Sequence, residues 1–116
     1  MRYLLLIYGD ESQWTERSEA DQQAELGRWM TYTQAISDEG IMRGGDALQP
    51  TAAATTVRVR DGETQVTDGP FAETREQLGG YYMIECDTLD QAIEAARRIP
   101  SVDRGSVEVR PIMEFD

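Results

Sequence analysis

Apolar and polar positions along the chain predict a sheet with two kinds of strand. Residues 3–8 are apolar at odd and even positions alike, and residues 79–86 repeat this pattern with Glu85 as the exception. Such segments are typical of central strands covered on both faces. Residues 107–113 instead alternate, and Pro111 among them favours an edge strand, because proline has no backbone N–H to donate to a neighbour.

Two segments with helical spacing follow the central strands. Ser18 and Asp21 resemble a capping box, which predicts a helix that begins after Ser18 and ends at Gly40. Asp87 and Thr88 offer a cap for a second helix that reaches Pro100. The apolar stripes expected to face the sheet comprise Leu26, Trp29, Met30, Thr33 and Ile36 in the first helix, and Leu89, Ala92, Ile93, Ala96 and Ile99 in the second.

The middle of the chain predicts a flexible link followed by a hairpin. Residues 44–50 are rich in turn formers, and residues 56–60 then alternate as a half-buried strand should. Asp61 and Gly62 form a two-residue turn signal. Closing the hairpin there places three valines on one inner face and pairs Arg60 with Glu63, Val59 with Thr64, Arg58 with Gln65 and Val57 with Val66.

The order of these elements predicts an α+β fold, a ferredoxin-like split βαβ sandwich formed by residues 1–116 as a single domain. Two helices can cover only one face of its antiparallel sheet, whereas the central strands are apolar on both. Monomers rarely expose an apolar patch of this extent. We therefore expect the second face to pack against the same face of another copy in a two-fold homodimer.

Composition narrows the classes of function. The chain has 116 residues, 40% of them hydrophobic, and a net charge of −11. That acidity argues against direct binding to nucleic acid or an anionic membrane. The apolar segment at the N-terminus is too short to cross a bilayer, and the single cysteine, Cys86, is expected to be a small buried hydrophobe in a reducing compartment. A cytoplasmic protein is expected.

The loop of residues 68–80 is the first candidate for chemistry, because it combines turn formers, carboxylates, a cation and an aromatic side chain. Asp68 and Glu73 are the candidate catalytic acid or base, and Arg75 and Phe71 are candidate ligand-binding residues. The competing interpretations are that Asp68 only shapes a turn and that Arg75 belongs to a solvated loop edge.

Further candidate ligand-binding residues are Tyr8, Tyr81, Tyr82 and Arg43. The phenols suit a bound carbonyl or carboxylate, although aromatics in central strands are usually core, and Arg43 suits an anion or simply the surface. The chain contains no histidine. A Ser-His-Asp or Cys-His mechanism and a histidine-based metal site are therefore excluded, and no motif predicts a cofactor. Metal binding by carboxylates alone stays open.

Four segments, residues 3–9, 44–48, 67–74 and 78–82, resemble the DGPF branch of the YCII-related proteins. The resemblance spans nearly the whole chain and implies a ferredoxin-like dimeric α/β barrel. Other branches look like enzymes that use a His-Asp pair, and DGPF members often occur beside extracytoplasmic-function sigma factors. This chain departs from the enzymatic pattern in lacking histidine, and it carries Arg75 where the branch usually has lysine.

Two hypotheses of function follow. The first is a homodimeric small-molecule-binding protein. One form of this hypothesis is a lyase- or isomerase-like enzyme that uses a carboxylate as acid or base. The alternative is a non-enzymatic regulatory or protein-interaction module that acts with a sigma factor, for which the acidic surface would suit a basic partner.

Overall fold

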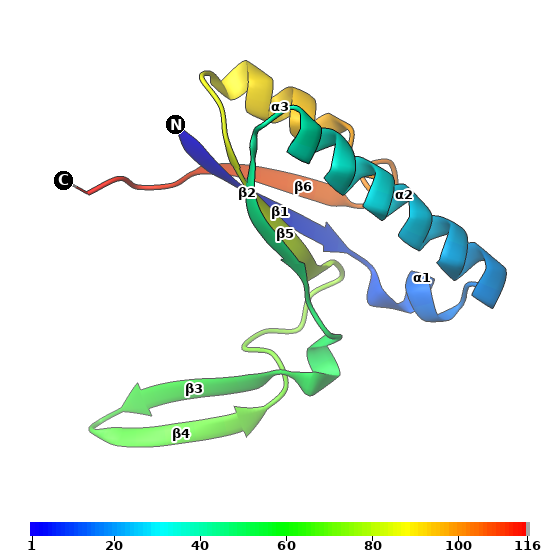
Figure 1. Ribbon diagram of the computed structural model, residues 1–116. Coiled ribbons are helices and arrows are strands. Elements are labelled where there is room, and N and C mark those ends of the chain that lie inside the picture. The colour runs from blue at the N-terminus through cyan, green and yellow to red at the C-terminus, as the bar shows by residue number, and fades with distance from the viewer. Residues whose placement is uncertain (116) are drawn as a thin grey trace.

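The computed structural model describes residues 1–115 and contains a four-stranded antiparallel sheet with the order β2-β5-β1-β6 (Figure 1). Two long helices lie on one face of the sheet, and a separate hairpin extends away from it. This α+β arrangement is compatible with a ferredoxin-like fold. The strands are β1 (Arg2–Gly9), β2 (Met42–Ala47), β3 (Thr55–Arg60), β4 (Glu63–Asp68), β5 (Gln77–Glu85) and β6 (Ser106–Pro111); the helices are α1 (Glu11–Thr15), α2 (Glu19–Asp38) and α3 (Leu89–Arg97), with a 3-10 turn at Thr51–Ala53.

The predicted position of the first strand is confirmed, because β1 lies between β5 and β6. Its side chains alternate between the two faces, as the period of an extended chain requires. Tyr3, Leu5 and Ile7 are buried toward the helices, whereas Leu4 and Leu6 are only half-buried on the other face. Pro111 ends β6 at the edge of the sheet, as predicted.

Both predicted helix starts are confirmed. The Ser18 side chain accepts a hydrogen bond from the Asp21 amide at 3.1 Å. Thr88 and Gln91 form a reciprocal capping box at the start of α3. Each cap satisfies a backbone donor that the first helical turn would leave without a partner. Within residues 1–115, no helix is both long and apolar enough to cross a membrane.

The predicted buried stripe of α2 is partly wrong. Leu26 and Met30 are exposed, whereas Tyr32 and Ile36 are buried and Trp29 is half-buried. Apolar residues on this helix are spread around more than one side, so spacing alone did not fix the helix rotation. The buried Tyr32 hydroxyl donates to the Ala95 carbonyl at 2.7 Å and joins α2 to α3.

The prediction of a flexible link at residues 44–50 is wrong for its first half. Residues 42–47 form β2, in which Gly45 pairs with Tyr82 and Asp46 with Tyr81 of β5. A Cβ atom at Gly45 would lie 2.8 Å from Cδ1 of Tyr82. The absence of a side chain at Gly45 therefore lets the Tyr82 ring lie against β2, a requirement of packing rather than of flexibility.

The hairpin forms with the predicted register, from the pair Arg60 and Glu63 to the pair Val57 and Val66. The prediction that its strands are half-buried is wrong, because Val57, Val59 and Val66 are 62%, 59% and 65% exposed. The hairpin projects from the body of the chain (Figure 1). The radius of gyration is accordingly 16.3 Å, against about 13 Å for a compact domain of this length.

Candidate functional site

A cavity of about 740 Å³ lies where α1 and the N-terminal half of α2 meet β1, β2 and β5. Both tryptophans of the chain line it, Trp14 from α1 and Trp29 from α2. Leu26 of α2 adds an aliphatic wall. An apolar enclosure of this size is typical of small-molecule sites.

Tyr82 forms the floor of the cavity on the helix-covered face of the sheet. Its ring stacks on Trp29 with centroids 6.4 Å apart and planes 15° apart, and Tyr32 meets it edge-on at 5.3 Å. The Tyr82 and Thr33 hydroxyl oxygens are hydrogen-bonded at 2.6 Å. These contacts on three sides fix the orientation of the Tyr82 ring, so the floor of the cavity is in place before any ligand binds.

A buried carboxylate, Glu25, holds one end of the cavity together. Its side chain is 1% exposed, and its two oxygens accept hydrogen bonds from Arg28, Arg104 and the Trp29 indole N–H. Arg17 approaches the same carboxylate at 3.7 Å. Segments from the loop before α2, from α2 and from the turn before β6 are therefore tied to one residue.

Glu25 is ionised and fully engaged. Burial opposes its charge, but the hydrogen bonds from Arg28 and Arg104 outweigh this effect and hold the pKa of the Glu25 carboxyl below its ordinary value. Both oxygens already accept charged donors. Glu25 is therefore suited to positioning Trp29 and the arginines, and unsuited to accepting a proton from a ligand.

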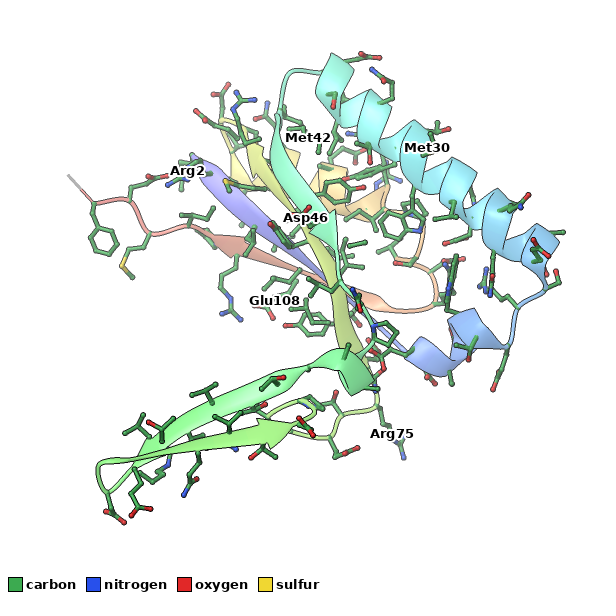
Figure 2. All side chains as sticks on the ribbon, turned by 60° about the horizontal axis from the view of Figure 1, so that its bottom comes forward. Arg2, Met30, Met42, Asp46, Arg75 and Glu108 are labelled. Carbon is green, nitrogen blue, oxygen red and sulfur yellow. The ribbon has the colours of Figure 1, made fainter. Side chains whose placement is uncertain are left out.

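A second carboxylate, Asp46, lies at the border of the cavity and has an oxygen available. The Tyr81 hydroxyl donates to Oδ2 of Asp46 at 2.8 Å, and this bond raises the pKa of Tyr81. Oδ1 of Asp46 has no hydrogen-bond partner within residues 1–115. Figure 2 shows Asp46 on β2, an edge strand of the sheet. Asp46 pairs with Tyr81, and Tyr81 pairs with Leu6, so both polar side chains lie on the face without helices, at the border of the cavity. Of the other carboxylates that line the cavity, Asp10 caps α1 and Glu11 binds Thr51.

The structure brings some of the predicted ligand-binding residues to this cavity. Tyr8, Tyr81 and Tyr82 all line it. Arg43 lies outside it and approaches the Glu85 carboxylate at 3.4 Å, while its guanidinium also donates to the Gly40 carbonyl at 2.8 Å. Arg43 thus has surface partners in the described chain.

The predicted loop residues lie elsewhere. Asp68, Glu73, Arg75 and Phe71 are exposed, and none of them lines the cavity. Phe71 has 78% of its surface exposed, and its carbonyl accepts a hydrogen bond from Arg58 at 3.1 Å. Figure 2 shows Arg75 at the base of the hairpin. The loop joins the cavity only indirectly, through the following Gln77.

Sequence reasoning missed the charged end of the cavity. Glu25 and Arg28 carry a local signal, because residues three apart on a helix are neighbours. Arg104 is 79 residues from Glu25, so no pattern along the chain connects them. Asp46 was placed in the supposed link, and Trp29 was assigned to the core.

A second hollow, of about 500 Å³, lies near the start of α3 and has a different character. Its lining includes five carboxylates, of Glu39, Glu85, Asp87, Asp90 and Glu94, and no aromatic residue. Its arginine, Arg98, is bound by Glu39 at 2.8 Å. No group of three potential metal ligands is suitably placed anywhere in residues 1–115, so we assign no site to this hollow.

Comparisons with known proteins identify the family of the chain. The family model of the YCII-related domain matches residues 1–116. An uncharacterised protein of Rhizobium meliloti (strain 1021) is 40% identical over 114 residues, which cover 97% of this chain and 92% of that protein. The chain belongs to the family of YCII-related domains.

Proposed function

We propose that the protein is a homodimeric small-molecule-binding protein whose ligand occupies the cavity between α1, α2 and the sheet. The observation that carries this proposal is the cavity itself, about 740 Å³ and lined by Trp14, Trp29 and Tyr82. Ligand sites are commonly enclosures of roughly 300–1,000 Å³ with apolar walls and a few fixed polar groups. The Thr33–Tyr82 hydroxyl pair supplies such groups here.

If the protein is also a catalyst, its reaction is of the lyase or isomerase type with a carboxylate as acid or base. Asp46 has an oxygen available and Tyr81 beside it is a phenolic donor, and both lie at the border of the cavity on the face of the sheet without helices. Asp68 and Glu73 stay predictions as catalytic residues. They act at this cavity only if the loop of residues 68–76 moves or meets a second copy.

Surface area supports the homodimer. The chain exposes 8136 Å², about 1,700 Å² more than the roughly 6,400 Å² expected of a compact monomer of 13.1 kDa. Stable interfaces bury on the order of 800 Å² or more from each partner. The face of the sheet without helices contributes Leu4, Leu6 and Met83, and the hairpin contributes its exposed valines. Together they offer enough surface for such an interface.

Local charge balance makes that face suitable for self-association despite the acidity of the chain. Three arginine–glutamate pairs surround Leu4, Leu6 and Met83. Figure 2 shows Glu108, a member of one pair, on the side of the sheet away from α2. Because each arginine in these pairs offsets a glutamate, two copies that meet through this face repel each other less than two unpaired acidic surfaces would, despite the net charge of −11. The pairs are Arg2–Glu114, Arg43–Glu85 and Arg110–Glu108.

Ligand binding is tested by a thermal-shift screen of small acids, phenols and carbonyl compounds, followed by calorimetry of the hits. Leu26→Trp adds an indole to the cavity wall and should abolish binding. Met30→Trp is the matched control, because Met30 lies on the same helix, is 74% exposed and is not part of the lining. Binding that survives Leu26→Trp would place the ligand elsewhere, and the absence of any hit would favour the protein-interaction module.

Assembly is tested by sedimentation equilibrium at micromolar concentration. We expect a dimer that Leu6→Arg dissociates, because that change places a charge in the middle of the helix-free face. Ile93→Arg is the control, since Ile93 is an exposed residue of α3 on the helix side. A folded monomer of the unaltered chain would contradict the proposal.

A further inference from the structure

The end of the cavity beside Glu25 carries more positive than negative charge. Arg17, Arg28 and Arg104 converge there on one carboxylate. Asp103 lies 3.6 Å from Arg104 and is the other acidic partner in the cluster. Within this cluster three arginines therefore face two carboxylates. Of the other carboxylates that line the cavity, Asp10 caps α1 and Glu11 binds Thr51, so neither is paired with Arg17.

Arg17 is the cation with donors available. Its side chain is 26% exposed and lines the cavity, and its distance of 3.7 Å from Glu25 is too long for a hydrogen bond. Its guanidinium has no hydrogen-bond partner within residues 1–115, whereas Arg28 donates to Glu25, and Arg104 donates to Glu25 and to the Pro100 carbonyl. A guanidinium presents a planar set of donors that matches a carboxylate in two-point contact.

The adjoining wall suits a flat apolar group. The stacked pair of Trp29 and Tyr82, with Trp14 and Leu26, makes the cavity apolar next to the arginines. Gly45, against which the Tyr82 ring lies, and Gly80 add backbone to the same part of the lining. The ring of a ligand with one anionic group would fill the apolar part of the cavity, and its anionic group would neutralise positive charge of the arginine cluster.

We infer that the cavity binds an aromatic carboxylate, with its ring among Trp14, Trp29 and Tyr82 and its carboxylate on Arg17, supported by Arg104. This inference rests on the proposed function, because it names the class of ligand for the same cavity. Glu25 then acts as a positioning residue, since it fixes Arg104 and the Trp29 indole while leaving Arg17 to the ligand.

The test compares acids with neutral molecules of the same shape. Phenylacetate, indole-3-acetate and 2-naphthoate, each with its primary amide, are titrated by calorimetry into the wild-type protein and into Arg17→Gln and Arg17→Lys. We expect each acid that binds to do so at least about tenfold more tightly than its amide. Arg17→Gln should remove this preference, and Arg17→Lys should retain part of it. Arg97→Gln is the control, because Arg97 is an exposed residue of α3 outside the cavity.

The outcomes separate this inference from the proposal beneath it. Equal affinity for acids and amides, or a preference for acids that survives Arg17→Gln, overturns the inference. The proposed function still stands in that case if Leu26→Trp blocks the binding. Binding of neutral compounds alone would likewise overturn the inference and leave the proposed function standing. If no compound of the broader screen binds, the proposed function and the inference both fail. Arg17→Gln should stay folded and lower the melting temperature less than Glu25→Gln does, since Arg17 approaches Glu25 only at 3.7 Å while Arg28 and Arg104 keep their hydrogen bonds to it.

Discussion

Replacing Glu25 with glutamine should destabilise the protein although the two side chains have nearly the same shape. The amide keeps one acceptor oxygen but places an N–H donor against Arg28 or Arg104, and it removes the charge on which three arginines converge. Breaking a buried ion pair costs about 3–5 kcal/mol. Because Arg17, Arg28 and Arg104 are 26%, 55% and 29% exposed and can regain water, we expect a smaller loss of unfolding free energy, about 2–3 kcal/mol.

The assay is thermal unfolding followed by circular dichroism, at one protein concentration because dimerisation makes the melting temperature concentration-dependent. For a chain of this size the loss corresponds to a decrease of about 8–12 °C at neutral pH. The pKa of Glu25 is lowered in the folded state, so its contribution is present above the ordinary value of 4.5 and is lost as the pH falls through the lower folded value. The gap between wild type and Glu25→Gln should therefore close in acid.

Glu94→Gln is the matched control. Glu94 also faces an arginine three residues further along its helix, Arg97, but both side chains are exposed to solvent. Its replacement should leave the melting temperature unchanged, because exposed pairs contribute little. A decrease below about 2 °C for Glu25→Gln at neutral pH, or a gap that persists unchanged into acid, would refute the view that Glu25 is a buried anion held by its arginines.

Three further changes test packing and capping by chemical denaturation. Gly45→Ala should lower the free energy of unfolding by about 1–3 kcal/mol, because its Cβ would meet the Tyr82 ring at 2.8 Å. An unaltered stability would mean that β2 is not packed against that ring. Tyr32→Phe should cost about 1–2 kcal/mol through loss of the buried bond to the Ala95 carbonyl, whereas a neutral result would indicate that water replaces the hydroxyl. Thr88→Ala should cost about 1 kcal/mol by removing the α3 cap, and Thr88→Ser should restore most of it; equal loss in both would argue against the cap.

Local patterns predicted the secondary structure where each element carries its own signal. The caps at Ser18 and Thr88 and the turn at Asp61 and Gly62 were predicted correctly, since each depends on groups a few residues apart. The strand at Met42–Ala47 was missed because its glycines are typical of a loop, and only the ring of Tyr82 across the sheet explains Gly45. Membership of the DGPF branch and a role for the Asp68 loop stay predictions.

What the sequence by itself determined was the α+β class, the order of the elements other than α1 and β2, and an excess of apolar residues, because these follow from periodicity and composition. Tertiary structure alone decided which polar residues share a site. Glu25 and Arg104 meet because α2 lies beside the turn that precedes β6, and Tyr82 joins Trp29 because β5 lies beneath α2. Contacts between residues so far apart depend on how helices and strands pack, and a pattern read along the chain contains no record of that packing.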